Sequence, residues 1–207
     1  NGKIIRLTSL NNAQSVIAEE VKRGAKTIVV VGKDDAFASV LAHSAVLPLV
    51  FGFIPIEEGM FGMLLGLREG SAASVVLSAR KIELLDIGWM NSRYFLGQVE
   101  IMPAGIAIDY DKRFHVRSKG GQMALTITNL YPFTGPAETK VRNANPQDGK
   151  MEAFVRPITK GGLLGHKKFY EKASVFPFQE MLVSGKHAFS VFADGVVPAA
   201  VYCVWSV

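Results

Sequence analysis

Cysteine is almost absent from this 207-residue sequence, which contains only Cys203. A single cysteine cannot form a disulfide within the chain, so the sequence excludes a disulfide-stabilised scaffold and favours a reducing, cytoplasmic compartment. Long apolar runs are also absent: the longest candidate, residues 41–55, contains His43, Ser44 and Pro48. It falls short of the roughly 20 apolar residues that a membrane-spanning helix needs. We therefore expect no membrane span.

Three functional signatures are missing as well. The four histidines have no metal-ligand spacing, and no G-x-S-x-G elbow indicates a hydrolase. The cations neither form a long block nor alternate with aromatic residues, so we expect no nucleic-acid partner. A net charge of +5 still suits an anionic ligand such as a nucleotide or an acidic lipid headgroup. A basic cluster is either a solvated face or a peripheral membrane contact; it comprises Lys160, His166, Lys167, Lys168 and Lys172.

Residues 28–67 carry the clearest pattern, in which a strand, a tight turn and a helix occur twice. Residues 28–31 (IVVV) and 50–54 (VFGFI) are apolar runs typical of parallel strands buried on both faces. Residues 35–45 have helical spacing between them. In such α/β units, ligands bind at the carboxyl ends of the strands, where the two turns lie. Around this centre we expect a strand over residues 3–8 and helices over 9–24 and 71–79, the last capped by Ser71.

After Arg80 the predicted pattern changes from alternating helices and strands to a succession of strands. We therefore expect an α/β domain over residues 1–80 and a β-sandwich over residues 81–207. Within the second part, residues 161–172 suggest a helical turn, and residues 175–207 a three-stranded meander.

Four segments resemble motifs of the diacylglycerol kinase, sphingosine kinase and NAD kinase superfamily. Residues 31–36 (VGKDDA) resemble its GGDGT phosphate loop, and residues 54–67 (IPIEEGMFGMLLGL) resemble its second loop, typified by IPLGTANDFARALGI. Residues 86–95 (DIGWMNSRYF) resemble the hairpin that opens the β-sandwich of bacterial lipid kinases. Residues 192–196 (FADGV) stand where the family has its DGE motif. Over about residues 3–200, the resemblance implies an incomplete Rossmann-like α/β domain, lacking the family's first strand and helix, followed by a β-sandwich domain.

The resemblance also implies a site. Nucleotide-binding residues would be Gly32, Lys33, Asp34, Asp35 and Gly59, with ATP and magnesium as cofactors. Glu57 and Glu58 are the candidate metal ligands, although acids at helix starts also simply complement the helix dipole. In an active enzyme, Asp34 and Asp194 would be the catalytic residues. Because the chain starts at Asn1 and not at methionine, residues upstream could complete the first domain or carry a targeting segment.

The sequence departs from the family pattern at three separate places. Lys33 and Asp35 replace glycines of the first loop, and Glu57 to Met60 replace Gly-Thr and Asn-Asp in the second. Val196 replaces the glutamate expected to act as general base, and valine cannot accept a proton. We therefore expect a catalytically inactive module that binds a lipid, a nucleotide or a partner protein. The alternatives are an active ATP- and magnesium-dependent lipid kinase and a purely structural interaction protein. An exposed strand edge would also permit a homodimer.

Overall fold

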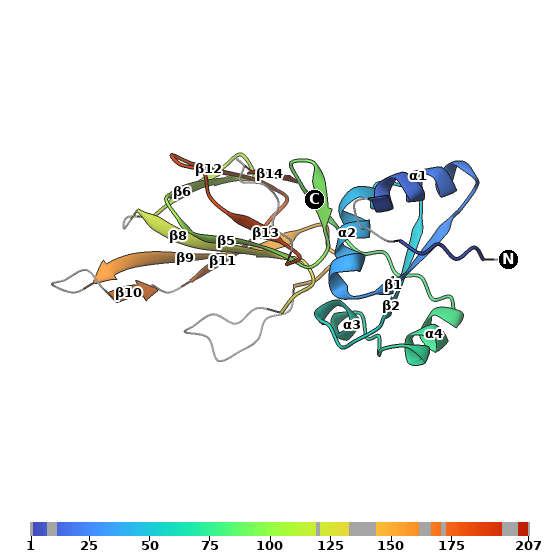
Figure 1. The fold of residues 1–207 in the computed structure, drawn as a ribbon. Coiled ribbons are helices and arrows are strands. Elements are labelled where there is room, and N and C mark those ends of the chain that lie inside the picture. The colour runs from blue at the N-terminus through green and yellow to red at the C-terminus, as the bar shows by residue number, and fades with distance from the viewer. Residues whose placement is uncertain are drawn as a thin grey trace. The chain divides into compact units, whose positions relative to one another are not determined.

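The computed structural model describes residues 2–7, 12–118, 121–132, 144–161, 167–170, 173–195 and 203–206. The chain divides into two compact units, Asn1–Glu83 and Leu84–Val207. Figure 1 shows that the labelled helices belong to the first unit, whereas the second is built from strands. This is the expected combination of an α/β part with a β-sandwich part.

The first unit is a small α/β layer. Its two strands, β1 (Thr27–Gly32) and β2 (Val50–Pro55), pair in parallel with Thr27 opposite Val50 and Gly32 opposite Pro55. Because the strands are parallel, the turns that follow them lie at the same end of the sheet. The helices are α1 (Ala13–Lys22), α2 (Asp34–Ser44), α3 (Met60–Leu64) and α4 (Ser71–Ser78).

Apolar side chains hold this layer together. One cluster joins Ala13 and Ile17 of α1 to Val40 of α2, with half-buried side chains of both strands packed against it. Phe37 of α2 stacks on Phe53 of β2 at 4.5 Å between ring centroids and meets Phe61 of α3 edge-on at 5.6 Å. The aromatic contacts fix α2 and α3 beside the ends of both strands.

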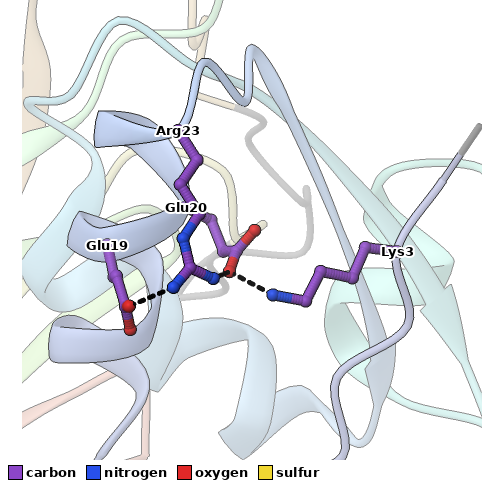
Figure 2. A network of polar contacts seen from close by, with 4 residues as sticks. All are labelled: Lys3, Glu19, Glu20 and Arg23. Atoms are coloured by element: carbon purple, nitrogen blue, oxygen red, sulfur yellow. Dashed lines mark hydrogen bonds and ion pairs between the residues drawn. The ribbon is translucent and has the colours of Figure 1, made fainter.

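Three expectations for the first unit were wrong. Residues 2–7 form neither strand nor helix; an ion pair of 2.6 Å between Lys3 and Glu20 holds this segment to α1 (Figure 2). The strand β1 is not buried on both faces: Ile28 and Val30 pack against the cluster of α1 and α2, whereas Val29 and Val31, on the other face, are exposed. The N-cap of α4 is Gly70, at φ 62°, and not Ser71.

The second unit consists of two sheets, each with six strands in the described residues. One sheet has the order β10-β9-β8-β5-β13, with β11 also on β9, and the other has the order β4-β3-β14-β12-β6-β7. A single apolar cluster is shared by strands of both sheets, with Ile108 and Val183 from one and Val99, Ile127 and Ala153 from the other. The strands are β3 (Gly88–Met90), β4 (Arg93–Phe95), β5 (Gln98–Ala104), β6 (Ile106–Tyr110), β7 (Phe114–Arg117), β8 (Gln122–Thr128), β9 (Met151–Gly161), β10 (Lys167–Tyr170), β11 (Ser174–Phe178), β12 (Glu180–Gly185), β13 (Val191–Ala193) and β14 (Cys203–Ser206).

Two expectations for the second unit were also wrong. Within residues 161–172, where a helical turn was expected, the described residues are Gly161 at the end of β9 and residues 167–170, which form the strand β10 and pair antiparallel with β9. Residues 175–207 do not form a meander, because β11 pairs with β9, β12 with β6 and β14, and β13 with β5. The pairing partners come from distant parts of the sequence, and a local pattern of strands and turns does not identify them.

Candidate functional site

The two turns singled out from the sequence meet at the carboxyl ends of β1 and β2. The Ile56 N–H donates to the Gly32 carbonyl at 3.1 Å, which continues the parallel ladder into the turns. Lys33 has an extended backbone and is followed directly by α2, while Gly59, also extended, is followed by α3. The fold therefore brings together the two turns that hold the predicted residues Gly32, Lys33, Asp34, Asp35, Glu57, Glu58 and Gly59.

Asp34 joins the first turn to the second. Its Oδ2 accepts a hydrogen bond of 3.0 Å from the Phe61 N–H in the first turn of α3. Gly59 makes the approach possible, because a Cβ on this residue would lie 2.5 Å from Asp34 Oδ1 and 2.7 Å from its Cγ. The carboxylate therefore takes the place where a helix start would otherwise present a free N–H to a ligand.

The other oxygen of Asp34 is without a protein partner. Oδ1 is buried and accepts no hydrogen bond within the part of the chain that the structure describes. A buried carboxylate oxygen normally has a donor, so this atom has unused hydrogen-bonding capacity.

Lys33 and Glu57 form a second connection between the turns. Their ion pair measures 2.8 Å, with 56% and 52% of the two side chains exposed. The hydrogen bond and charge of Glu57 raise the pKa of Lys33. A phosphate at Lys33, as predicted, would therefore have to compete with Glu57 for the ammonium group.

The remaining acids of the turns are exposed. The Ala36 N–H donates to Asp35 Oδ1 at 2.8 Å, and Glu58 lies on the surface. Counting Lys33, Asp34, Asp35, Glu57 and Glu58, one cation and four anions give a formal net charge of −3. Among the described residues, no three acidic, histidine or cysteine side chains are grouped as metal ligands. The magnesium site at Glu57 and Glu58 and the nucleotide site of the two turns stay predictions.

Asp194 lies in the second unit, in the turn after β13. Its carboxylate accepts backbone N–H bonds of 2.9 Å from Leu96, 2.9 Å from Gly97 and 2.8 Å from Gln98. Burial raises the pKa of Asp194, and these three hydrogen bonds oppose the rise. With both oxygens engaged, Asp194 connects the end of β13 to the loop before β5. Val196, the position of the expected general base, lies outside the described residues.

The hairpin motif at residues 86–95 forms β3 and β4, with Asn91 in the turn at φ 55°. Gly88 is required by packing, because a Cβ there would lie 2.2 Å from the ring of Phe95. Asp86 Oδ2 accepts the Gly149 N–H at 2.7 Å, and the fully buried Asn129 donates to the Asp86 carbonyl at 2.7 Å. These motif residues therefore hold the sandwich together.

Sequence reasoning missed Glu152 on β9. Burial, with a smaller contribution from the charge of Asp148, raises its pKa to about 7. Its Oε2 is buried and has no partner among the described residues. No motif pointed to this residue, because it is a single acidic position among the apolar residues at the start of β9. The basic cluster beginning at Lys160 cannot be evaluated, since its side chains lie outside the described part.

Comparisons with known proteins place the fold. No family model and no curated protein matches the sequence. Among solved structures, a diacylglycerol kinase from Bacillus anthracis str. Sterne matches with a TM-score of 0.71 and 16% identity, over 98% of this chain and 80% of that chain. A putative diacylglycerol kinase from the same organism matches with a TM-score of 0.76 and 15% identity, over 98% and 81% of the two chains. Another putative diacylglycerol kinase of that organism gives 0.73 and 15%, over 98% and 82%.

At this level of identity the likeness establishes the fold. No helix among the described residues has the length and apolar character needed to cross a bilayer. The chain thus has the diacylglycerol kinase-like fold, an α/β unit followed by a β-sandwich, that its sequence motifs indicated.

Proposed function

We propose that this protein has a diacylglycerol kinase-like fold without phosphotransfer activity, and that it acts by binding a lipid, a nucleotide or a partner protein. One observation carries the proposal: the two turns that would hold a triphosphate instead bind each other. Asp34 contacts Gly59 and accepts the Phe61 N–H, while Lys33 pairs with Glu57. The Phe61 N–H and the Lys33 ammonium group, which could otherwise bind a phosphate, therefore already have partners within the chain.

The charge of the turns acts in the same direction. Two unit charges of like sign at 4 Å repel by about 4 kcal/mol at an effective dielectric constant of 20. The charges of Lys33 and Glu57 cancel each other, which leaves the negative charges of Asp34, Asp35 and Glu58 in the two turns. A triphosphate would have to bring its own cations to overcome this repulsion.

The supply of a general base is equally limited. Asp194 is the acid next to the position where the family motif has its glutamate, and its two oxygens accept three backbone N–H groups. Val196 has no atom that accepts a proton. A lipid hydroxyl attacking a phosphate would therefore lack a base from this segment.

Calorimetric titration with ATP, with and without magnesium, tests the proposal. We expect no transfer of radiolabelled phosphate from ATP to diacylglycerol in mixed micelles, and the binding heat shows whether the protein nevertheless binds the nucleotide. Magnesium-dependent binding in the micromolar range together with phosphate transfer would refute it. Extraction of the purified protein followed by lipid mass spectrometry then separates lipid binding from the other two modes of action.

An active ATP-dependent lipid kinase remains the second candidate, favoured by the unpartnered Asp34 Oδ1. In that case this oxygen would bind a cation or a substrate hydroxyl. Asp34→Asn would then abolish turnover with little change in stability, because asparagine keeps an oxygen for the Phe61 N–H. Glu57→Gln is the matched control for a change of charge in the same site, and it would reduce turnover only if Glu57 binds the metal.

A further inference from the structure

Three aromatic side chains of the second unit form a stack. The ring centroid of Tyr110, at the end of β6, lies 4.1 Å from that of Phe176 on β11 and 4.8 Å from that of Phe114 on β7, at interplanar angles of 17° and 18°. Phe176 and Phe114 cannot share one face of the Tyr110 ring, because two nearly parallel rings so close to its centroid would overlap. They therefore cover opposite faces. Since Phe176 packs against the core of the sandwich, Phe114 is the outer end of the stack.

The free face of the Phe114 ring is exposed. Phe114 is 52% exposed, more than any other aromatic side chain in the part of the chain whose burial the structure describes. One of its faces covers Tyr110, so the exposure belongs to the other face and the ring edges. Among the described residues Phe114 stacks on no further ring. A ring that is held from behind and open in front is the platform on which proteins stack a planar aromatic ligand.

The charges around the β6–β7 hairpin favour an anionic ligand. The carboxylates of this hairpin and of the adjacent start of β12 all have partners: Asp109 contacts His115, Asp111 accepts the N–H groups of Gln179 and Glu180, and Glu180 pairs with Lys112 at 3.0 Å. By contrast, Arg113 and Arg117 are exposed, and neither forms an ion pair with a described carboxylate. The charge left uncompensated at this surface is therefore positive.

The two arginines differ in their place relative to the ring. Arg113 directly precedes Phe114 at the hairpin turn, where its N–H donates to the Tyr110 carbonyl at 3.2 Å. Arg117 stands at the other end of β7, opposite Ala107. Because side chains alternate along a strand, positions 114 and 117 belong to opposite faces of the sheet. Only Arg113 is thus adjacent to the exposed ring.

We propose that Phe114 and Arg113 form a mononucleotide site in the second unit. The nucleobase stacks on the free face of Phe114, and the phosphate binds the Arg113 guanidinium. Every nucleobase has a π-face, so such a site selects nucleotides as a class and not one base. The inference does not depend on the proposed function, because it uses residues of the second unit and neither of the two turns at β1 and β2.

NMR titration of adenosine 5′-monophosphate with the full 207-residue chain tests the stacking. We expect a saturable upfield shift of the adenine H2 and H8 signals, as the ring current of Phe114 requires. Phe114→Leu, which keeps an apolar side chain but removes the ring, should weaken binding by about fivefold to a hundredfold. Phe114→Trp, which enlarges the ring, should bind as tightly or more tightly, and it keeps the test decisive if Phe114→Leu does not fold. Absence of a saturable shift with the wild-type chain, or an affinity that Phe114→Leu leaves unchanged, overturns the proposal.

The phosphate contact has its own matched pair of variants. Arg113→Gln should weaken binding of adenosine 5′-monophosphate by about twofold to fivefold, as the loss of an exposed ion pair implies, and should leave binding of adenosine unchanged. Arg117→Gln removes the same charge from the other face of β7 and should affect neither ligand. Equal effects of the two substitutions overturn the assignment of Arg113.

A third substitution separates this site from the turns of the first unit. Lys33→Gln removes the one cation of those turns and should not change the adenine shifts. If Lys33→Gln abolishes the shifts and Phe114→Leu does not, the nucleotide binds at the turns and the proposed site is wrong. Because none of these titrations measures phosphate transfer, they can fail while the proposed lack of phosphotransfer activity still holds.

Discussion

Substitution of Gly59 by alanine tests whether Asp34 joins the two turns. The added Cβ would lie 2.5 Å from Asp34 Oδ1 and 2.7 Å from Asp34 Oδ2, so the carboxylate has to leave the Phe61 N–H. Backbone strain is not part of the expected effect, because the extended conformation of Gly59, at φ −153° and ψ 166°, is one that alanine also adopts. Overpacking and the lost hydrogen bond together should destabilise the first unit by about 1–3 kcal/mol.

The matched background is Asp34→Ala, which removes the carboxylate that the new Cβ would meet. By itself this change should cost about 1 kcal/mol, as the loss of a helix-capping side chain usually does. In this background Gly59→Ala should become neutral or stabilise by about 0.4–1 kcal/mol, because alanine restricts the unfolded chain more than glycine does. The double-mutant cycle thus predicts a coupling free energy above about 1 kcal/mol.

The two units can be followed by different probes. Every described helix lies between Ala13 and Ser78, so circular dichroism at 222 nm during urea unfolding reports mainly on the first unit. Both tryptophans, Trp89 and Trp205, belong to the second unit, and their fluorescence is the internal control. Gly59→Ala should shift the dichroism midpoint and leave the fluorescence midpoint unchanged. The reasoning is refuted if Gly59→Ala has the same effect with and without Asp34, within about 0.5 kcal/mol.

Three further substitutions test the other polar contacts. Asp194→Asn should destabilise the second unit by about 2–4 kcal/mol in tryptophan-monitored unfolding, because an amide cannot accept all three backbone N–H groups; an unchanged midpoint would contradict this. Folding raises the pKa of Glu152 from 4.5 to about 7, so the second unit should lose stability as the pH rises through this range. Glu152→Gln should reduce the dependence of the unfolding free energy on pH. Part of this dependence should remain, because the pKa of Asp194 is also raised. Glu57→Gln should lower the pKa of Lys33, measured by NMR titration of its ammonium group, without changing the dichroism midpoint, since the pair is exposed.

The local sequence pattern was sufficient to predict much of the secondary structure of the first unit. The β-branched run became β1, the helix expected over residues 35–45 became α2, and Gly24 ends the preceding helix region at φ 96°. These features depend on hydrophobic periodicity and turn chemistry, both of which are properties of neighbouring residues. Exposure of Val29 and Val31 was not predictable, because burial of a strand's side chains depends on what covers each face of the sheet.

The second unit shows the limit of local reasoning more clearly. Its strands were recognisable, yet β9 pairs with β8 and β11, and β13 with β5, partners that no short-range pattern specifies. The candidate site has the same character. Gly59 was identified from its motif, but its contact with Asp34 joins residues 25 positions apart. The spacing of residues predicted that the turns would be neighbours, and only the structure gives the atoms in contact.

Lys33 and Glu57, which differ from the family motifs they resemble, compensate each other's charge. Lys33 alone would place an unpaired cation beside the end of β1, and Glu57 alone would place an unpaired anion beside the end of β2; together they form an ion pair of 2.8 Å. By contrast, Gly59 has the space that the Asp34 carboxylate needs, because the three atoms nearest to an added Cβ all belong to Asp34. A loop that binds phosphate keeps its donors and cations free for the ligand, whereas this pair satisfies a cation within the protein. Lys33 and Glu57 therefore neutralise each other's charge without a ligand, which is the arrangement that the proposed loss of phosphotransfer activity requires.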